Sequence, residues 1–169
     1  DHLRALKRLH PERVMGISDA DLRRYHTVYK NNFVQLQTRF DETVQRLKLS
    51  PQDVSKLATV VQLAYEGGVA RLDAMFGSVA RLVDEYGLDR EVLIAFTADH
   101  GETLYREDRR FKWTHAPDLQ PEVITVPLMI RWPGGLRPRA IDEVTRSIDV
   151  YPTLAGLARV GVPPEAKVE

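Results

Sequence analysis

Two short apolar segments in the second half of the chain constrain its fold most strongly. Residues 92–97 read Val-Leu-Ile-Ala-Phe-Thr, and residues 126–132 read Val-Pro-Leu-Met-Ile-Arg-Trp before a Pro-Gly-Gly turn. Short continuous apolar runs of this kind are typical of strands that are buried on both faces of a sheet. We expect a third short strand at 143–147 and a helix at 150–159. This order of strand, loop, strand and helix predicts an α/β sheet with helical cover.

The first part of the chain is rich in charged and helix-forming residues. From Asp19 to Leu47, apolar side chains recur with a period of about 3.6 residues, which predicts one amphipathic helix with Ser18 or Asp19 as its N-cap. We therefore interpret residues 1–60 as a helical connector or lid segment. Residues 61–169 are interpreted as the C-terminal part of an α/β domain.

A second helix is predicted to begin at Pro51. Ser50 suits the N-cap position, proline suits the first helical position, and Asp53 stands where a capping box places its acid. The Gly67-Gly68 pair weakens the middle of this helix, so a kink or a break is expected there. Gly87 suits a C-terminal stop.

The composition excludes several classes of protein. The 24 basic and 24 acidic residues balance, whereas a general nucleic-acid binder needs an excess of positive charge to offset phosphates. The absence of cysteine excludes disulfides and thiolate metal sites. No apolar run approaches the ~18 residues of a membrane span. The chain starts at Asp1 without a methionine, which we read as a cut or processed end, so the compartment stays open.

The residues after the first apolar run are the strongest candidates for chemistry. Asp99-His100-Gly101 follows the strand at its carboxyl end, where ligands bind in open α/β sheets. A carboxylate beside an imidazole suits Mn²⁺, Zn²⁺ or iron, whereas Ca²⁺ prefers a shell of oxygens. Gly101 keeps the backbone close to such a site. The alternative is a capped turn, in which Asp99 caps a short helix with Glu102 in its first turn and His100 is a surface residue.

Four sequence blocks together resemble the sulfatase family, within the alkaline-phosphatase-like superfamily. The blocks occur in the family's order, and the resemblance covers residues 62–163. They are Tyr65 to Asp73 in the second helix, Val92 to Glu102, Val126 to Gly134, and Ile148 to Leu154. The resemblance implies part of an alkaline-phosphatase-like α/β sheet with helical cover, preceded by a helical N-terminal segment.

The resemblance also implies roles for individual residues. Asp99 and His100 occupy the positions that complete a metal shell, and the ion would be Ca²⁺ or Mn²⁺, with Zn²⁺ as a further option. Lys112 and His115 are the candidates for the basic residue that contacts sulfate or phosphate oxygens. The alternatives are a solvated Lys112 and a His115 that only orders its loop.

The sequence departs from the family in what it lacks. The family nucleophile is a Cys or Ser converted to formylglycine, or a Thr or Ser in phosphoryl-transferring relatives, and no residue here has that context. We therefore expect the C-terminal part of a metal-dependent sulfuric ester hydrolase. It would be inactive alone, would partner with its missing N-terminal half, and would act on a small-molecule or glycan sulfate ester. The alternatives are a phosphodiester or phosphonate hydrolase, a phosphoethanolamine transferase, or a catalytically dead binding module.

Overall fold

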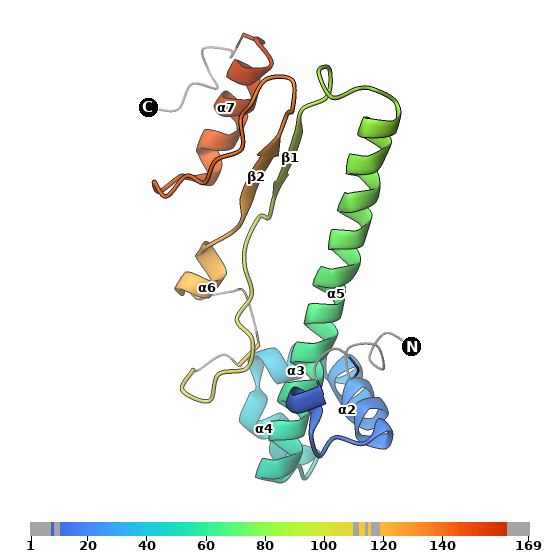
Figure 1. Cartoon of the computed structure of the whole chain (residues 1–169). Helices are drawn as coiled ribbons and strands as arrows, with labels where there is room; N and C mark the ends of the chain where they lie inside the picture. The colour runs from blue at the N-terminus through green and yellow to red at the C-terminus, as the bar shows by residue number, and fades with distance from the viewer. Residues whose placement is uncertain (1–7, 9–10, 110–111, 114, 116–118, 162–169) are drawn as a thin grey trace. The chain divides into compact units, whose positions relative to one another are not determined.

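The computed structural model divides the chain into two compact units. It describes residue 8 and residues 11–109, 112–113, 115 and 119–161. The first unit comprises Asp1–Ala80 with His100–Thr125, and the second comprises Arg81–Asp99 with Val126–Glu169. Figure 1 shows the order of the elements along the chain. None of the described helices is long and apolar enough to cross a membrane.

The first unit is built from helices and one long loop. Its elements are the 3-10 helix η1 (Pro11–Val14), the helices α2 (Asp19–Asn31), α3 (Phe33–Thr38) and α4 (Phe40–Arg46), most of α5 (Pro51–Glu85), and the short helix α6 (Pro121–Ile124). The helix α6 lies within a stretch that the sequence predicts to be loop, and Pro121 begins it. The expected boundary at residue 60 falls inside α5, which continues through it.

The single helix expected from Asp19 to Leu47 is wrong, because the chain forms α2, α3 and α4 there. The first break is at Asn32, whose side-chain amide donates to the Val28 carbonyl at 2.8 Å. Such local bonds compete with the helical hydrogen-bond pattern, so asparagine favours helix ends. The second break is at Arg39, one residue after Thr38. The apolar period continues through both breaks because all three helices bury residues in one core.

The two predicted helix starts are confirmed. The Ser18 hydroxyl accepts from the Asp21 backbone amide at 3.0 Å, and the Asp21 carboxylate accepts from the Ser18 amide at 3.0 Å. Ser50 and Asp53 form the same reciprocal pair at the start of α5. Each pair satisfies amides that have no partner inside the helix.

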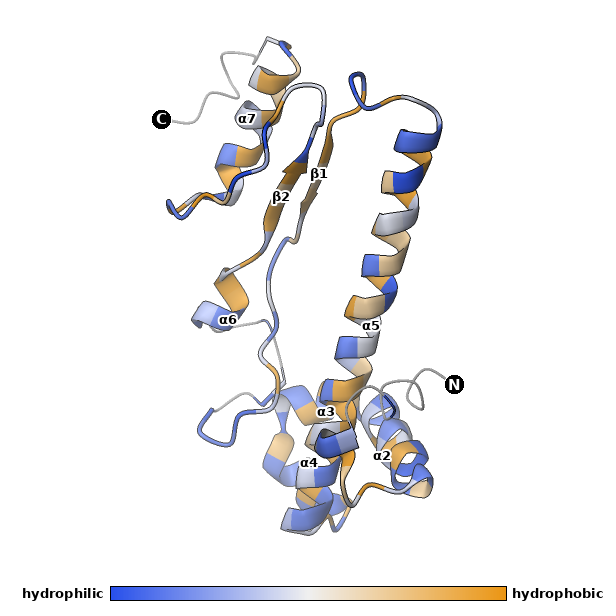
Figure 2. Cartoon of the chain, in the orientation of Figure 1, coloured by the Kyte–Doolittle hydropathy of each residue, from blue (hydrophilic) through white to orange (hydrophobic). Residues whose placement is uncertain are grey.

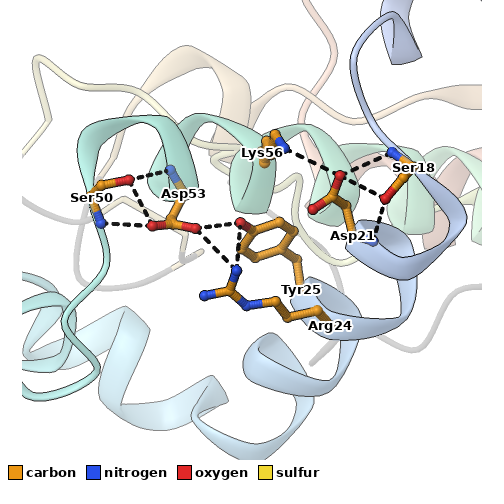
Figure 3. Close-up of polar contacts among 7 residues, drawn as sticks. All are labelled: Ser18, Asp21, Arg24, Tyr25, Ser50, Asp53 and Lys56. Carbon is orange, nitrogen blue, oxygen red and sulfur yellow. Dashed lines mark hydrogen bonds and ion pairs between the residues drawn. The ribbon is translucent and has the colours of Figure 1, made fainter.

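A polar network connects α2 to the beginning of α5, as Figure 3 shows. The Tyr25 hydroxyl donates to Asp53 at 2.5 Å, and Arg24 lies 3.4 Å from the same carboxylate oxygen. Lys56 reaches back to Asp21 at 3.2 Å. The carboxylates that cap the two helices therefore also hold them together.

The helix α5 is continuous through Gly67-Gly68, so a break at this pair, one of the two outcomes expected there, is wrong. A Cβ built on Gly68 meets no atom within 4 Å. This glycine therefore lowers the local helix propensity without serving a close contact. The helix ends at Glu85, and Gly87 follows with a φ of +66°, which confirms the predicted stop.

One hydrophobic core fills the first unit. Its least exposed large residues are Tyr25, Leu36, Leu57, Val60 and Leu63. The loop residue Trp113 joins this core with 2% of its surface exposed. Its ring lies 5.9 Å from Tyr29, 5.7 Å from Phe40 and 5.2 Å from Tyr105, measured between centroids. Trp113 therefore fixes the loop between the two strands onto the helices of the same unit.

The second unit contains a two-stranded antiparallel sheet. Strand β1 (Ile94–Thr97) pairs with β2 (Leu128–Arg131) so that Ile94 lies opposite Arg131 and Thr97 opposite Leu128. Both strands fall in the apolar segments that predict them, and Figure 2 shows their hydrophobic character. Burial on both faces of β1 is wrong in the described structure, because half-buried and exposed residues alternate along the strand. With β2 as its only pairing strand among the described residues, the other edge of β1 has no strand partner there.

The third expected strand at 143–147 is absent from the described residues of this region. The 3-10 helix η2 (Ser147–Asp149) begins there and leads into α7 (Val150–Leu157). The Asp149 carboxylate accepts from the backbone amide of Arg146 at 2.9 Å, which tightens this turn. The predicted helix at 150–159 is therefore confirmed, although it ends two residues earlier.

Candidate active site

The structure places Asp99 and His100 just beyond the end of β1, as the sequence predicts. Both side chains are exposed. Asp99 closes a segment of the second unit, and His100 opens a segment of the first. No helix follows Asp99 in the described residues up to Arg109, so the short helix of the capped-turn alternative is wrong.

Gly101 has a specific steric role next to this pair. Its backbone amide donates to the Val123 carbonyl at 2.6 Å. A Cβ at this position would lie 2.1 Å from the Glu122 carbonyl oxygen. Glycine is therefore required because the loop backbone runs directly against α6.

His100 has two contacts that restrict its ring. Its Nδ1 lies 2.8 Å from the carbonyl oxygen of Gly101. Its ring stacks on the ring of His115, with centroids 4.1 Å apart and an interplanar angle of 19°. If Nδ1 donates to the carbonyl, Nε2 keeps a lone pair, which is the arrangement commonly found in metal-binding histidines.

The structure brings His115 to His100 and gives Lys112 different surroundings. The Lys112 ammonium donates to the Glu107 carbonyl oxygen, and it lies 6.0 Å from the centroid of the Phe40 ring. Lys112 also lines a cavity of about 270 Å³ with Arg109 and residues 38–42. The two basic candidates therefore do not share one position.

Glu102 belongs to this cluster, and the sequence did not point to it as a site residue. Its Oε2 lies 3.4 Å from Nδ1 of His115. Its Oε1 is buried and has no hydrogen-bond partner among the described residues. Burial raises the pKa of the Tyr29 hydroxyl to about 12, and the negative charge of Glu102 adds to that shift. The one available sequence signal was its place immediately after Asp99-His100-Gly101.

The described residues do not contain a complete metal shell. No group of three or more histidine, aspartate or glutamate residues in the described parts of the chain is arranged to hold an ion.

Comparison with known proteins identifies the family. The family model described as Sulfatase matches residues 22–160, and the chain belongs to this family. The match begins in α2, so it extends the resemblance well before residue 62. The family's fold is alkaline-phosphatase-like and α/β, and the helices and the β1–β2 sheet are compatible with it.

Individual relatives cover different shares of the chain. An endo-4-O-sulfatase of Bacteroides thetaiotaomicron is 31% identical over 99 residues, which are 57% of this chain and 18% of the relative. Steryl-sulfatase of Mus musculus is 33% identical over 117 residues, which are 63% of this chain and 19% of the relative. Iduronate 2-sulfatase of Mus musculus is 27% identical over 165 residues, and this match covers 79% of this chain and 28% of the relative. The chain thus spans 18% to 28% of the length of these relatives. No solved structure matches it.

Proposed function

We propose that this chain is the C-terminal part of a metal-dependent hydrolase of sulfate esters. The observation that carries the proposal is the sulfatase family match over residues 22–160. The three relatives described above are all named as sulfatases, which does not favour the phosphoryl-transfer alternatives or a dead binding module. The substrate is a small-molecule or glycan sulfate ester.

Asp99 and His100 are proposed to contribute two ligands to the divalent ion that sulfatases use. The pair suits the role chemically, because it offers a carboxylate oxygen and an imidazole nitrogen. The contact between His100 Nδ1 and the Gly101 carbonyl supports Nε2 as the ligand nitrogen. The other ligands would come from the missing N-terminal half of the same protein. The ion would be Ca²⁺ or Mn²⁺, with Zn²⁺ as a further option, and would supply positive charge near the sulfate group.

His115 is proposed as the residue of this chain that donates a hydrogen bond to the sulfate oxygens. Its ring lies against that of a proposed metal ligand, which supports a place beside the ion. A donor aimed at oxygens that gain charge in the transition state accelerates the reaction. Lys112 is the second candidate for this role, although its ammonium is engaged by Glu107 in this structure. Residues 1–60 are proposed as a connector or lid segment.

The nucleophile would come from outside the 169 residues, because the chain contains no cysteine and no serine or threonine in the family's nucleophile context. The isolated chain should therefore hydrolyse neither p-nitrophenyl sulfate nor bis-p-nitrophenyl phosphate. The intact protein should hydrolyse the sulfate ester much faster than the phosphate diester. Faster hydrolysis of the diester would replace this proposal with the phosphodiesterase alternative.

Two single variants of the intact protein test the basic residues. His115→Ala should lower kcat by roughly 10²-fold or more, as expected for loss of an oxyanion donor. Lys112→Ala should leave kcat near the wild-type value, and both variants should retain bound metal. If Lys112→Ala lost most of its kcat and His115→Ala kept the wild-type kcat, Lys112 rather than His115 would be the donor to the sulfate oxygens.

A further inference from the structure

We propose that Glu102 is a positioning residue that holds the His115 imidazole through Nδ1, so that Nε2 is the nitrogen presented to the sulfate group. The inference rests on the proposed role of His115. It adds a residue that neither the sequence motifs nor the comparisons assign.

Two contacts together restrict the His115 ring. Stacking on His100 sets the plane of the ring, with an interplanar angle of 19°. The Glu102 carboxylate, 3.4 Å from Nδ1, selects which edge of the ring faces the protein. The His115 side chain is 45% exposed, and an exposed histidine without such contacts would sample several rotamers. The carboxylate therefore limits the ring to one orientation.

Glu102 is partly buried, and the burial of its Oε1 has a cost in stability. Its side chain is only 27% exposed, and Oε1 has no hydrogen-bond partner among the described residues. A buried acceptor without a partner loses its hydration and gains nothing in return. This unpartnered oxygen therefore contributes nothing to stability. The contact between Oε2 and His115 supplies a functional reason for keeping it.

The backbone supports this pair from both sides. Glu102 follows Gly101, whose amide is bonded to the Val123 carbonyl at 2.6 Å. His115 follows two residues after Trp113, which is 2% exposed in the core of the same unit. Both ends of the contact are therefore attached to fixed points, as a precise catalytic geometry requires.

The test compares Glu102→Leu with Glu102→Gln in the intact protein, using p-nitrophenyl sulfate. Leucine fills a similar space but offers no acceptor, and it also removes the unpartnered buried oxygen. Glu102→Leu should lower kcat by on the order of 10- to 100-fold with little change in KM. Its melting temperature should equal or exceed that of the wild type. Glu102→Gln keeps an acceptor oxygen and should recover most of the lost kcat.

The matched control is Glu122→Gln. Glu122 is also partly buried in the first unit, and its Oε1 also has no hydrogen-bond partner among the described residues. Its Oε1 forms an ion pair with Arg109, at 3.7 Å from the guanidinium nitrogen Nη2. The kcat of Glu122→Gln should stay near the wild-type value. A loss in Glu122→Gln as large as that in Glu102→Leu would overturn the specific role of Glu102.

A second readout does not depend on activity. In the 169-residue chain labelled with ¹⁵N-histidine, the imidazole nitrogen shifts of His115 should show the proton on Nδ1, and Glu102→Leu should redistribute it between Nδ1 and Nε2. His115→Ala assigns the signals among the five histidines. Unchanged shifts in Glu102→Leu, or a kcat as high as that of the wild type, would refute the positioning role. If His115→Ala itself retained full kcat, the proposed function of His115 would fall instead.

Discussion

Replacing Gly101 with alanine should destabilise the first unit measurably. The added Cβ would lie 2.1 Å from the Glu122 carbonyl oxygen and 3.1 Å from the carbonyl carbon. Both atoms belong to the backbone of α6, so no side-chain rotation can relieve the overlap. Relieving the overlap requires α6 to move away by roughly 1 Å, and this movement also breaks the bond from the Gly101 amide to the Val123 carbonyl.

The expected cost combines two effects. Overpacking costs about 1–3 kcal/mol, and a lost backbone hydrogen bond costs about 1 kcal/mol. Gly101→Ala should therefore lose roughly 2–4 kcal/mol, which corresponds to a fall of roughly 5–15 °C in the melting temperature of a chain of this size.

Gly68→Ala is the matched control for this measurement. It adds the same methyl group within α5, where nothing lies within 4 Å. Alanine is favoured over glycine by roughly 0.5–1 kcal/mol inside a helix, so this variant should melt slightly above the wild type. Thermal unfolding followed by circular dichroism measures both variants. If Gly101→Ala melted with or above the wild type, the close approach of the loop to α6 would be wrong.

Three further predictions concern metal binding and pH. In the intact protein, Asp99→Ala and His100→Ala should each weaken metal binding by at least on the order of 10-fold. Asp73→Ala should not, because Asp73 lies within the helix α5 and is not a proposed ligand. Equal metal content by elemental analysis in Asp99→Ala and wild type would contradict the ligand role. Hydrogen bonds from Ser50, then from Tyr25, hold the pKa of Asp53 below its ordinary 3.8. Ionised Asp53 therefore stabilises the fold above pH 3.8, and this contribution is lost as the pH falls from 3.8 through the lowered pKa of the folded state. In Asp53→Asn, the free energy of unfolding measured with urea should depend less on pH in this acid range. Burial, and then the bond to Asp53, raise the pKa of Tyr25 to about 12 from 10.0. Its contribution is present below pH 10.0 and lost as the pH rises towards 12, so Tyr25→Phe should remove this alkaline loss; an unchanged alkaline limb would refute the assignment.

The features that the sequence predicts well are local ones. The capping box at Ser50 depends on residues three positions apart, so its hydrogen bonds follow from the residue types, and Ser18 was one of the two N-cap residues predicted for α2. The breaks at Asn32 and Arg39 could not be predicted in this way, because the apolar period of one helix continues across them. Tertiary packing decides whether such a pattern folds as one helix or as three.

The candidate site shows the same division between local and tertiary information. Asp99 and His100 are neighbours in a recognisable motif, so the sequence singles them out as a pair. The approach of His115 to His100 depends on Trp113, which packs into a core built mainly from distant helices. Glu102 carries no pattern of its own, and its significance comes from the unpartnered oxygen and the nearby imidazole. The spacing of residues in the sequence predicts neither the unpartnered oxygen nor the nearby imidazole.

The insertion of Trp113 among the helices has a consequence for the order of folding. The rest of its core lies between Val14 and Leu63, so the tryptophan arrives from at least 50 residues further along the chain. During synthesis from the N-terminus, the helices are made before Trp113. Until Trp113 is made, part of their apolar surface is exposed to water. Closing such a long-range contact carries a loop entropy that slows folding. The completion of this core, and with it the placement of His115, should therefore be a late event in the folding of the newly made chain.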